Sequence, residues 1–221
     1  MNIVLLGPPG VGKGTQAKNI EKHFIIPHVS TGDLVRKTIE CNSEINITLK
    51  RRLETGLLIS DTMISTILRK RITQSDCNNG FILDGFPRNI AQANILKELG
   101  VNINYVVEIT LDDAEIIKRV SGRFIHEPSG RSYHIKNNPP KIYGKDDVTK
   151  EPLVQRIDDK PEVIAQRLTT YYSQTTDVMA YYQKFDNANN QCCNSRYIKV
   201  NGKQSIDKIT QDIINQLTKI S

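Results

Sequence analysis

A glycine-rich loop directly follows the first apolar run of this chain. Residues 3–6, IVLL, lead into the stretch GPPGVGKGTQ at residues 7–16. Glycines between a strand and a helix expose several backbone N–H groups, and Lys13 adds a positive charge. The segment therefore predicts a loop that holds the phosphates of a nucleotide. The usual pattern has Ser or Thr directly after the lysine, whereas here Gly14 comes first and Thr15 follows it.

Short apolar runs rich in Ile and Val alternate with longer helical patterns along the chain. The expected strands are residues 3–6, 28–29, 81–84, 105–110 and 197–200. Amphipathic stretches lie between them, and Asp61–Ile72 is a clear example because its apolar residues recur at helical spacing. This alternation is typical of an α/β protein with a parallel sheet wrapped by helices.

The pattern breaks between Gly122 and about residue 158. This stretch is rich in proline and glycine, which is too much turn chemistry for a regular element, and it is too long for an ordinary loop. We therefore expect a small inserted lobe here.

Two helix starts on either side of this stretch follow from local spacing. Asp112 with Glu115, and Asp159 with Glu162, are three residues apart as in a capping box, and Pro161 stands in the first turn of the second helix. Asp112 and Asp159 are therefore predicted to cap these helices.

The composition excludes several classes of protein. The 221-residue chain has a net charge of +6, but its Lys and Arg residues are spread along its length and aromatic residues make up 6%. It offers little for stacking bases, so we expect no nucleic-acid partner. No apolar run approaches the roughly 20 residues of a membrane helix, and the first strand begins too early for a leader peptide. We expect one main domain in the cytoplasm, with no membrane partner.

A second motif, FILDGFPR, ends an apolar strand at residues 81–88. A carboxylate such as Asp84, at a strand end beside a phosphate loop, can hold Mg²⁺ or its waters, and Arg88 can pair bidentately with a second phosphate. A lone aspartate at a strand end is more often a turn residue or a helix cap. Beside a phosphate loop we favour the metal role.

Further arginines stand at the ends of the predicted elements. Arg119 and Arg123 are one helical turn apart, where like charges repel unless an anion or a base lies between them. Arg156 and Arg167 flank the end of the inserted lobe, and Arg36 follows STGD. Each alone is more often a solvated or salt-bridged surface residue. Together they favour a converging site, because phosphoryl transfer needs positive groups that follow charge between donor and acceptor.

Five motifs, in this order and spacing, resemble those of the adenylate kinase family in its long form with a full lid. They are GPPGVGKGT, STGDLVR, DGFPRN, GRFIHEPSGRSYH and RIDDKPEVIAQRL. The resemblance spans nearly the whole chain. It implies reversible transfer of the terminal phosphoryl group of Mg-ATP to AMP, giving two ADP, with lid closure excluding water. The corresponding role is adenine nucleotide homeostasis.

The same resemblance implies an architecture. It is the P-loop three-layer α/β fold, with a five-stranded parallel sheet, helices on both faces and a small inserted lid. The core would comprise residues 1–29, 60–121 and 160–221, the AMP-binding segment residues 30–59 and the lid residues 122–159. The protein would act as a monomer on ATP, AMP and ADP.

Residue roles are carried over from the family motifs. Gln92 would read the adenine edge of AMP, and Arg119 would stack on the adenine of ATP. The implied catalytic residues are Lys13, Asp84, Arg88, Arg123, Arg156 and Arg167. The implied ATP-binding residues are Gly10, Gly12, Lys13, Gly14, Thr15, Arg119, Arg123, Tyr133 and Gln204. The implied AMP-binding residues are Thr31, Arg36, Leu58, Ile59, Gly85, Arg88, Gln92, Arg156 and Arg167. Asp84 and the Asp158–Asp159 pair would support magnesium waters and lid closure, with the helix cap as the equal alternative for Asp159.

Four polar residues of the lid raise the question of zinc. His126, Ser129, Asp146 and Thr149 have the spacing at which some relatives place four cysteines around a structural Zn²⁺. Ser and Thr hydroxyls are poor zinc ligands. We predict that these side chains hydrogen-bond to one another and hold no structural zinc, with weak uptake of stray zinc by a His–Asp pair as the alternative. The expected cofactor is Mg²⁺, bound with ATP.

Other nucleotide-binding functions stay open at this point. One is a sister kinase that takes GTP as donor, since stacking by Arg119 discriminates bases poorly. Uridylate and cytidylate kinases usually have a short lid, and a nucleotide-binding regulator would use the fold without transfer. Switch GTPases and motor ATPases ligate Mg²⁺ with a hydroxyl directly after the lysine, and this chain has Gly14 there. That difference and the set of arginines favour a phosphotransferase.

Overall fold

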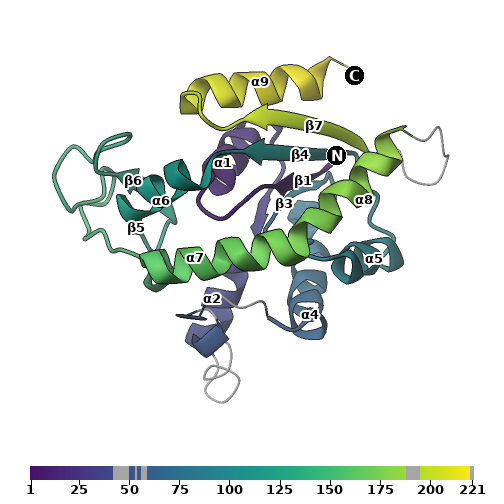
Figure 1. Ribbon diagram of the computed structural model, residues 1–221, viewed down its shortest axis with the longest axis horizontal. Coiled ribbons are helices and arrows are strands. Elements are labelled where there is room, and N and C mark those ends of the chain that lie inside the picture. Colours follow the sequence, from purple (N-terminus) through teal and green to yellow (C-terminus); the bar gives the residue numbers. More distant parts are fainter. Residues whose placement is uncertain (42–49, 53, 56–58, 188–194, 220–221) are drawn as a thin grey trace.

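A five-stranded parallel sheet forms the centre of the protein. The structure is a computed structural model, and it describes residues 1–41, 50–52, 54–55, 59–187 and 195–219. The strands run in the order β2-β3-β1-β4-β7, all parallel (Figure 1). They are β1 (Asn2–Leu6), β2 (His28–Ser30), β3 (Phe81–Asp84), β4 (Tyr105–Thr110) and β7 (Arg196–Asn201). The predicted α/β fold class with a five-stranded parallel sheet is confirmed. β3 and β4 have their predicted ranges, and β1, β2 and β7 exceed theirs by one or two residues.

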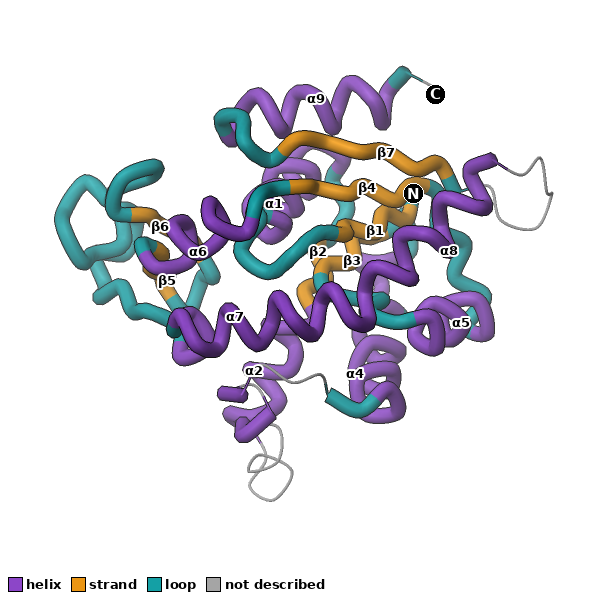
Figure 2. The backbone as a smooth tube through the Cα atoms, in the orientation of Figure 1, coloured by secondary structure: helices purple, strands orange, loops and turns teal. Residues whose placement is uncertain are grey.

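Helices cover both faces of the sheet, as Figure 2 shows. One face is covered by α1 (Lys13–Phe24) and α9 (Ile206–Thr218). The other is covered by α2 (Thr31–Cys41), α4 (Asp61–Ile72), α5 (Ile90–Glu98) and α8 (Thr176–Asn187). The chain also forms α6 (Asp113–Ser121) and α7 (Pro161–Thr170), which pack on each other.

Alternating side chains of the central strand explain the two cores. Ile3 and Leu5 of β1 pack under α1 and α9, whereas Val4 and Leu6 pack under the helices of the opposite face. Successive side chains of a strand point to opposite faces, so an apolar run of this length is buried on both sides. The same packing brings the carboxyl ends of β1 and β3 together, because Leu5 pairs with Asp84.

The inserted segment contains regular structure that the sequence does not predict. β5 (Arg123–His126) and β6 (Arg131–His134) form an antiparallel hairpin at one end of the molecule (Figure 1). The expectation of no regular element in this stretch was therefore wrong. A turn closed by Gly130, with φ +61°, joins two strands of four residues each, and runs this short between turn residues carry little periodic signal.

The two predicted helix caps also differ from the structure. Asp112 is the N-cap residue of α6, but its side chain makes no capping hydrogen bond. α7 begins one residue later than the motif implies, with Lys160 as its N-cap. The cap predicted for Asp159 was wrong, because its carboxylate accepts hydrogen bonds from Arg123 instead. The guanidinium of Arg123 gives this carboxylate two charge-assisted hydrogen bonds at once, and this bidentate pairing holds it away from the helix. None of the helices in the described residues is both long and apolar enough to cross a membrane.

Candidate functional site

The glycine-rich loop between β1 and α1 forms an anion-binding helix N-terminus. Gly12 is the N-cap residue of α1 and has a left-handed backbone, φ +108°. Because glycine has no side chain, no side chain at this position caps the helix. The first turn of α1 has no acidic residue, so its free N–H groups and helix dipole favour a bound anion. A Cβ on Gly10 would stand 2.3 Å from a methyl of Val120 on α6. The loop therefore lies against α6 so closely that glycine is required there.

Lys13 lies inside this loop. Its Nζ donates to the carbonyl oxygens of Gly7 and Pro8 at 2.7 and 2.9 Å. An ammonium group has three N–H donors, so one remains for a phosphate. Burial lowers the pKa of Lys13 to about 8, although the nearby carboxylate of Asp84 opposes this shift. The lysine is thus buried and held in position before any phosphate arrives.

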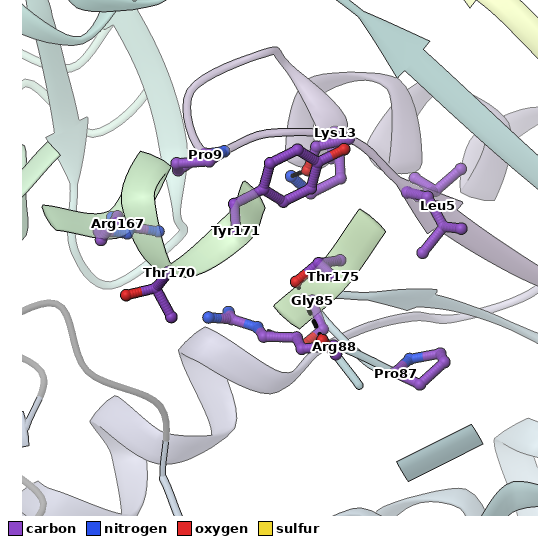
Figure 3. Close-up of a pocket in the computed structure, with 12 residues that line it drawn as sticks. Leu5, Pro9, Lys13, Gly85, Pro87, Arg88, Arg167, Thr170, Tyr171 and Thr175 are labelled. Carbon is purple, nitrogen blue, oxygen red and sulfur yellow. Dashed lines mark hydrogen bonds between the residues drawn. The ribbon is translucent and has the colours of Figure 1, made fainter. Parts of the chain in front are cut away.

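Arg88 follows β3 and faces the loop across a pocket. Figure 3 shows this pocket, which is lined by Lys13, Arg88 and Arg167 together with Tyr171. The Nε of Arg88 donates to the carbonyl of Gly85 at 2.7 Å. In the described part of the chain this guanidinium forms no ion pair, and burial lowers its pKa. Arg88 therefore presents unneutralised charge to the pocket.

A π-helical turn between α7 and α8 supports Arg88 from the other side. This turn comprises Tyr171–Thr175, and turns of this type are frequent at functional sites. The hydroxyl of Thr175, which is buried, donates to the backbone carbonyl of Arg88 at 3.0 Å. The backbone N–H of Arg88 donates to the side-chain oxygen of Gln92 at 2.7 Å. The peptide groups of Arg88 are thus fixed on both sides.

Arg123 and Arg167 each form an ion pair with an aspartate. Arg167 donates to Asp158 at 2.7 Å, and Arg123 donates to Asp159 through its Nε at 2.8 Å and through a second nitrogen. Burial lowers the pKa of Arg167 to about 10. These two aspartates are neighbours in the chain, so both ion pairs lie at the start of α7.

Asp33 joins two more of the arginines. One of its oxygens accepts from Arg36 at 2.6 Å and from Arg156 at 3.4 Å. Burial would raise the pKa of Asp33, but the charge and hydrogen bond of Arg36, with the charge of Arg156, outweigh it and lower the pKa to about 2. Asp33 belongs to the same STGDLVR motif as Arg36, and that motif was the signal for its place in the site.

Asp84 has the surroundings expected of a group near Mg²⁺. Its Oδ2 lies 3.5 Å from the position of a Cβ on Gly14, at the first turn of α1. Burial would raise its pKa, but the hydrogen bond from His28 (3.3 Å) and the charge of Lys13 lower it, so the carboxylate stays ionised. Carboxylate oxygens and water are the ligands that Mg²⁺ prefers. The group therefore fits a role toward magnesium waters, and the contact with His28 was not predicted.

The inserted segment, which is the predicted lid at residues 122–159, contacts α1. Lys18 donates to the backbone carbonyls of Ser129 and Gly130, which form the turn between β5 and β6. A second connection runs from Arg156, near the end of the lid, to Asp33 on α2. In this structure the lid segment thus touches both the phosphate-loop helix and the helix that begins the predicted AMP-binding segment.

The four polar residues of the lid form one hydrogen-bond network. His126 bonds to Ser129 at 2.7 Å and to Thr149 at 3.2 Å, and Thr149 donates to Asp146 at 3.1 Å. Three further residues complete the network, and their part in it was not predicted. They are Arg131 and Tyr133, which donate to Asp146, and Glu151, which lies 2.6 Å from His126. The absence of structural zinc stays a prediction.

Four other residues with predicted nucleotide contacts form hydrogen bonds within the protein. Thr31 is buried, and its hydroxyl donates to the carbonyl of Asp84. Arg119 donates to the carbonyl of Gly202, in the turn that precedes α9. The side chain of Gln204 donates to Asp212 of α9, and the hydroxyl of Tyr133 donates to Asp146. The ATP contacts of Gln204 and Tyr133 stay predictions.

Two predicted AMP-binding residues lie beyond the end of α2. Ile59 packs against the core under α4, α5 and α8. Leu58 lies outside the described residues, as does most of the Asn-rich stretch at residues 186–195.

Comparison with known proteins places this geometry in context. The family model described as adenylate kinase matches residues 5–187. A protein of Francisella tularensis subsp. novicida named adenylate kinase is 50% identical over 219 residues, which cover 99% of this chain and 100% of that protein. The adenylate kinase of Francisella philomiragia subsp. philomiragia is 50% identical over 217 residues, covering 98% of this chain and 100% of the relative. The similarity thus extends over nearly the whole chain.

Proposed function

Because the chain belongs to the adenylate kinase family, and thus transfers phosphoryl groups between adenine nucleotides, we propose that it moves the terminal phosphoryl group of Mg-ATP to AMP. The reaction is reversible and yields two ADP. The observation that carries this proposal is the convergence of Lys13, Arg88 and Arg167 on one pocket beside the phosphate loop. Donor and acceptor phosphates would meet there.

The donor is held by the phosphate loop. Free N–H groups at the start of α1 and the third donor of Lys13 would bind the β- and γ-phosphates. Mg²⁺, which arrives with ATP, would neutralise part of the phosphate charge, and Asp84 would hold its waters. The adenine would lie near Arg119, whose guanidinium is anchored at Gly202.

The acceptor is held on the opposite side of the pocket. Arg88 and Arg36 would bind the phosphate of AMP, and Gln92 would contact its base. Arg123, Arg156 and Arg167 would follow the negative charge as the γ-phosphoryl group moves between the two nucleotides. Catalysis then consists of in-line positioning and charge stabilisation, because the transferring group needs no covalent help from the protein.

Lid closure excludes water from this centre in the proposed mechanism. Water would otherwise accept the phosphoryl group and ATP would be lost. The contacts that Lys18 of the core and Asp33 of the AMP-binding segment make with residues of the lid support a closed arrangement. The division into a core (residues 1–29, 60–121 and 160–221), an AMP-binding segment (30–59) and a lid (122–159) belongs to this proposal. A monomeric state and a cytoplasmic location stay predictions.

The direct test is ADP formation by the purified protein, with Mg-ATP or Mg-GTP as donor and AMP, GMP, UMP or CMP as acceptor. A strong preference for Mg-ATP with AMP is the expected result. Preference for GTP would keep the arginine roles and change the donor. Absence of transfer with every pair would overturn the proposal.

The buried position of Lys13 predicts a pH dependence. With its pKa lowered to about 8, Lys13 in the free enzyme is charged below this pH and loses its proton as the pH rises through it. Since kcat/KM reports the groups of the free enzyme, kcat/KM for Mg-ATP is expected to fall above about pH 8. At saturating Mg-ATP the rate should begin to fall only at a higher pH, because bound phosphates stabilise the ammonium form of Lys13.

A pH series of initial rates between about pH 6.5 and 9.5 measures this effect. The Lys13→Arg variant is the control, because a guanidinium stays charged throughout this range. The residual activity of this variant should not fall above about pH 8. A profile of the natural protein that stays flat to the upper end of the range would contradict the prediction.

A further inference from the structure

The side-chain amide of Gln92 is fixed at both of its ends. Its Oε1 accepts from the backbone N–H of Arg88 at 2.7 Å, and its Nε2 donates to Asp61 Oδ1 at 2.7 Å. Gln92 is buried, with 3% of its surface exposed. Asp61 is the first residue of α4, and Gln92 belongs to α5. The contact therefore joins two helices through residues that are 31 positions apart in the sequence.

The two partners of Gln92 differ in chemistry and permit only one orientation of the amide. A backbone N–H can only donate, and an ionised carboxylate can only accept. If the amide turned by 180°, its NH₂ group would face the N–H of Arg88 and its oxygen would face Asp61. Both buried contacts would then be lost, which is costly because one involves a charge. The network therefore determines where the amide oxygen and nitrogen lie.

Helix capping alone does not require this arrangement. Asn89 caps α5 by accepting from the backbone N–H of Gln92, and the contact between Gln92 and Arg88 resembles the return bond of a capping box. A glutamate at position 92 would serve that local purpose equally well. The bond to Asp61 needs an N–H donor on residue 92. Capping of α5 therefore does not explain why this residue is a glutamine.

Asp61 is itself held in place. Asn89 Nδ2 donates to its two oxygens at 3.1 and 3.3 Å. Three side chains from α4, α5 and the residue preceding α5 thus form a closed set of hydrogen bonds. The amide of Gln92 keeps one lone pair on its oxygen and one N–H on its nitrogen for a ligand.

We propose that Asp61 is a positioning residue that sets which base the acceptor site takes, by fixing the orientation of the Gln92 amide. This inference rests on the proposed function, in which Gln92 contacts the base of AMP. Adenine presents an N6–H donor next to an N1 acceptor, which matches a free amide oxygen next to a free N–H. Hypoxanthine and guanine present the reverse, an O6 acceptor next to an N1–H donor, and meet the fixed amide with both contacts mismatched.

The experiment compares kcat/KM for AMP with kcat/KM for inosine monophosphate (IMP). IMP differs from AMP only at the two edge positions that the amide would contact, and it lacks the extra amino group of GMP. The natural protein is expected to favour AMP by about a hundredfold or more. Asp61→Asn, which can donate as well as accept, is expected to lower this ratio by about tenfold, mainly by gaining activity with IMP.

Two further variants protect the test against a folding defect. Asp61→Ser leaves room for a water that can donate or accept, and serine is well tolerated at a helix start, so it should lower the ratio like Asp61→Asn. Asp61→Glu keeps an acceptor-only group and should retain most of the discrimination. Asp76→Asn is the matched control, because Asp76 pairs with Arg71 away from Gln92 and its loss should leave the ratio unchanged.

The outcomes separate this inference from the proposed function. An unchanged AMP to IMP ratio in both Asp61→Asn and Asp61→Ser, with AMP activity present, would overturn the role of Asp61 and leave the function standing. An equal loss with both acceptors would indicate a general structural role and would also overturn it. Failure of the natural protein to phosphorylate AMP would instead refute the proposed function itself, and the inference with it.

Discussion

Replacing Lys13 with methionine is expected to lower kcat/KM for Mg-ATP by about a thousandfold. Methionine keeps most of the length of the side chain and removes its charge. The ammonium of Lys13 lies within the phosphate loop, held by the carbonyls of Gly7 and Pro8, and its remaining donor is available to the donor phosphates. A charge buried in this way acts more strongly on a neighbouring phosphate than it would in water.

Initial rates with varied Mg-ATP at saturating AMP provide the measurement. Lys22→Met is the matched control, since Lys22 is an exposed residue of the last turn of the same helix. It should leave kcat/KM nearly unchanged. A loss of less than about tenfold in Lys13→Met would remove the lysine from contact with the transferring group.

Replacing Arg88 with alanine is expected to lower transition-state stabilisation by ~3 to 4 kcal/mol, as for the loss of one charged donor at the reaction centre. Two arginines line the pocket, and among the described residues Arg88 is the one of them that forms no ion pair. Burial lowers its pKa, so binding a phosphate stabilises its charged form more than that of Arg167. The backbone of Arg88 is fixed by Gln92 and Thr175. The variant should therefore lose its side-chain contacts while the surrounding turn stays in place.

Kinetics with varied AMP test this expectation, and the Arg88→Lys variant refines it. Lysine restores a charge but not the planar fork that pairs bidentately with phosphate, so it should recover only part of the loss. Arg69→Ala, at an exposed position near the end of α4, serves as the control. A decrease of only a few-fold in kcat/KM for Arg88→Ala would mean that this arginine does not contact the reacting phosphates.

Much of the architecture follows from local sequence signals. The strands around the phosphate loop could be predicted because they are buried on both faces and appear as continuous apolar runs. The phosphate loop could be predicted because its glycines and Lys13 stand at fixed spacing. The grouping of the arginines could be anticipated because each stands at the end of a predicted element or in a recognisable motif.

Contacts between distant segments could not be predicted in this way. Thr175 supports Arg88 across 87 residues, from a π-helical turn that no periodic pattern announces. Asp159 has the spacing of a helix cap, yet Arg123, 36 residues earlier, is the stronger partner. Such pairings depend on tertiary packing, which overrides the local preference of a single residue.

The aspartates beside the site arginines have a consequence for turnover. Asp33, Asp158 and Asp159 already neutralise most of the guanidinium groups that a phosphate would contact. A nucleotide that enters therefore replaces one anionic partner by another, and its affinity reflects the difference between two similar ion pairs. When the products leave, the carboxylates can return to the arginines, so no exposed cluster of like charges has to form. A strongly cationic centre can in this way release two highly charged products without retaining either of them.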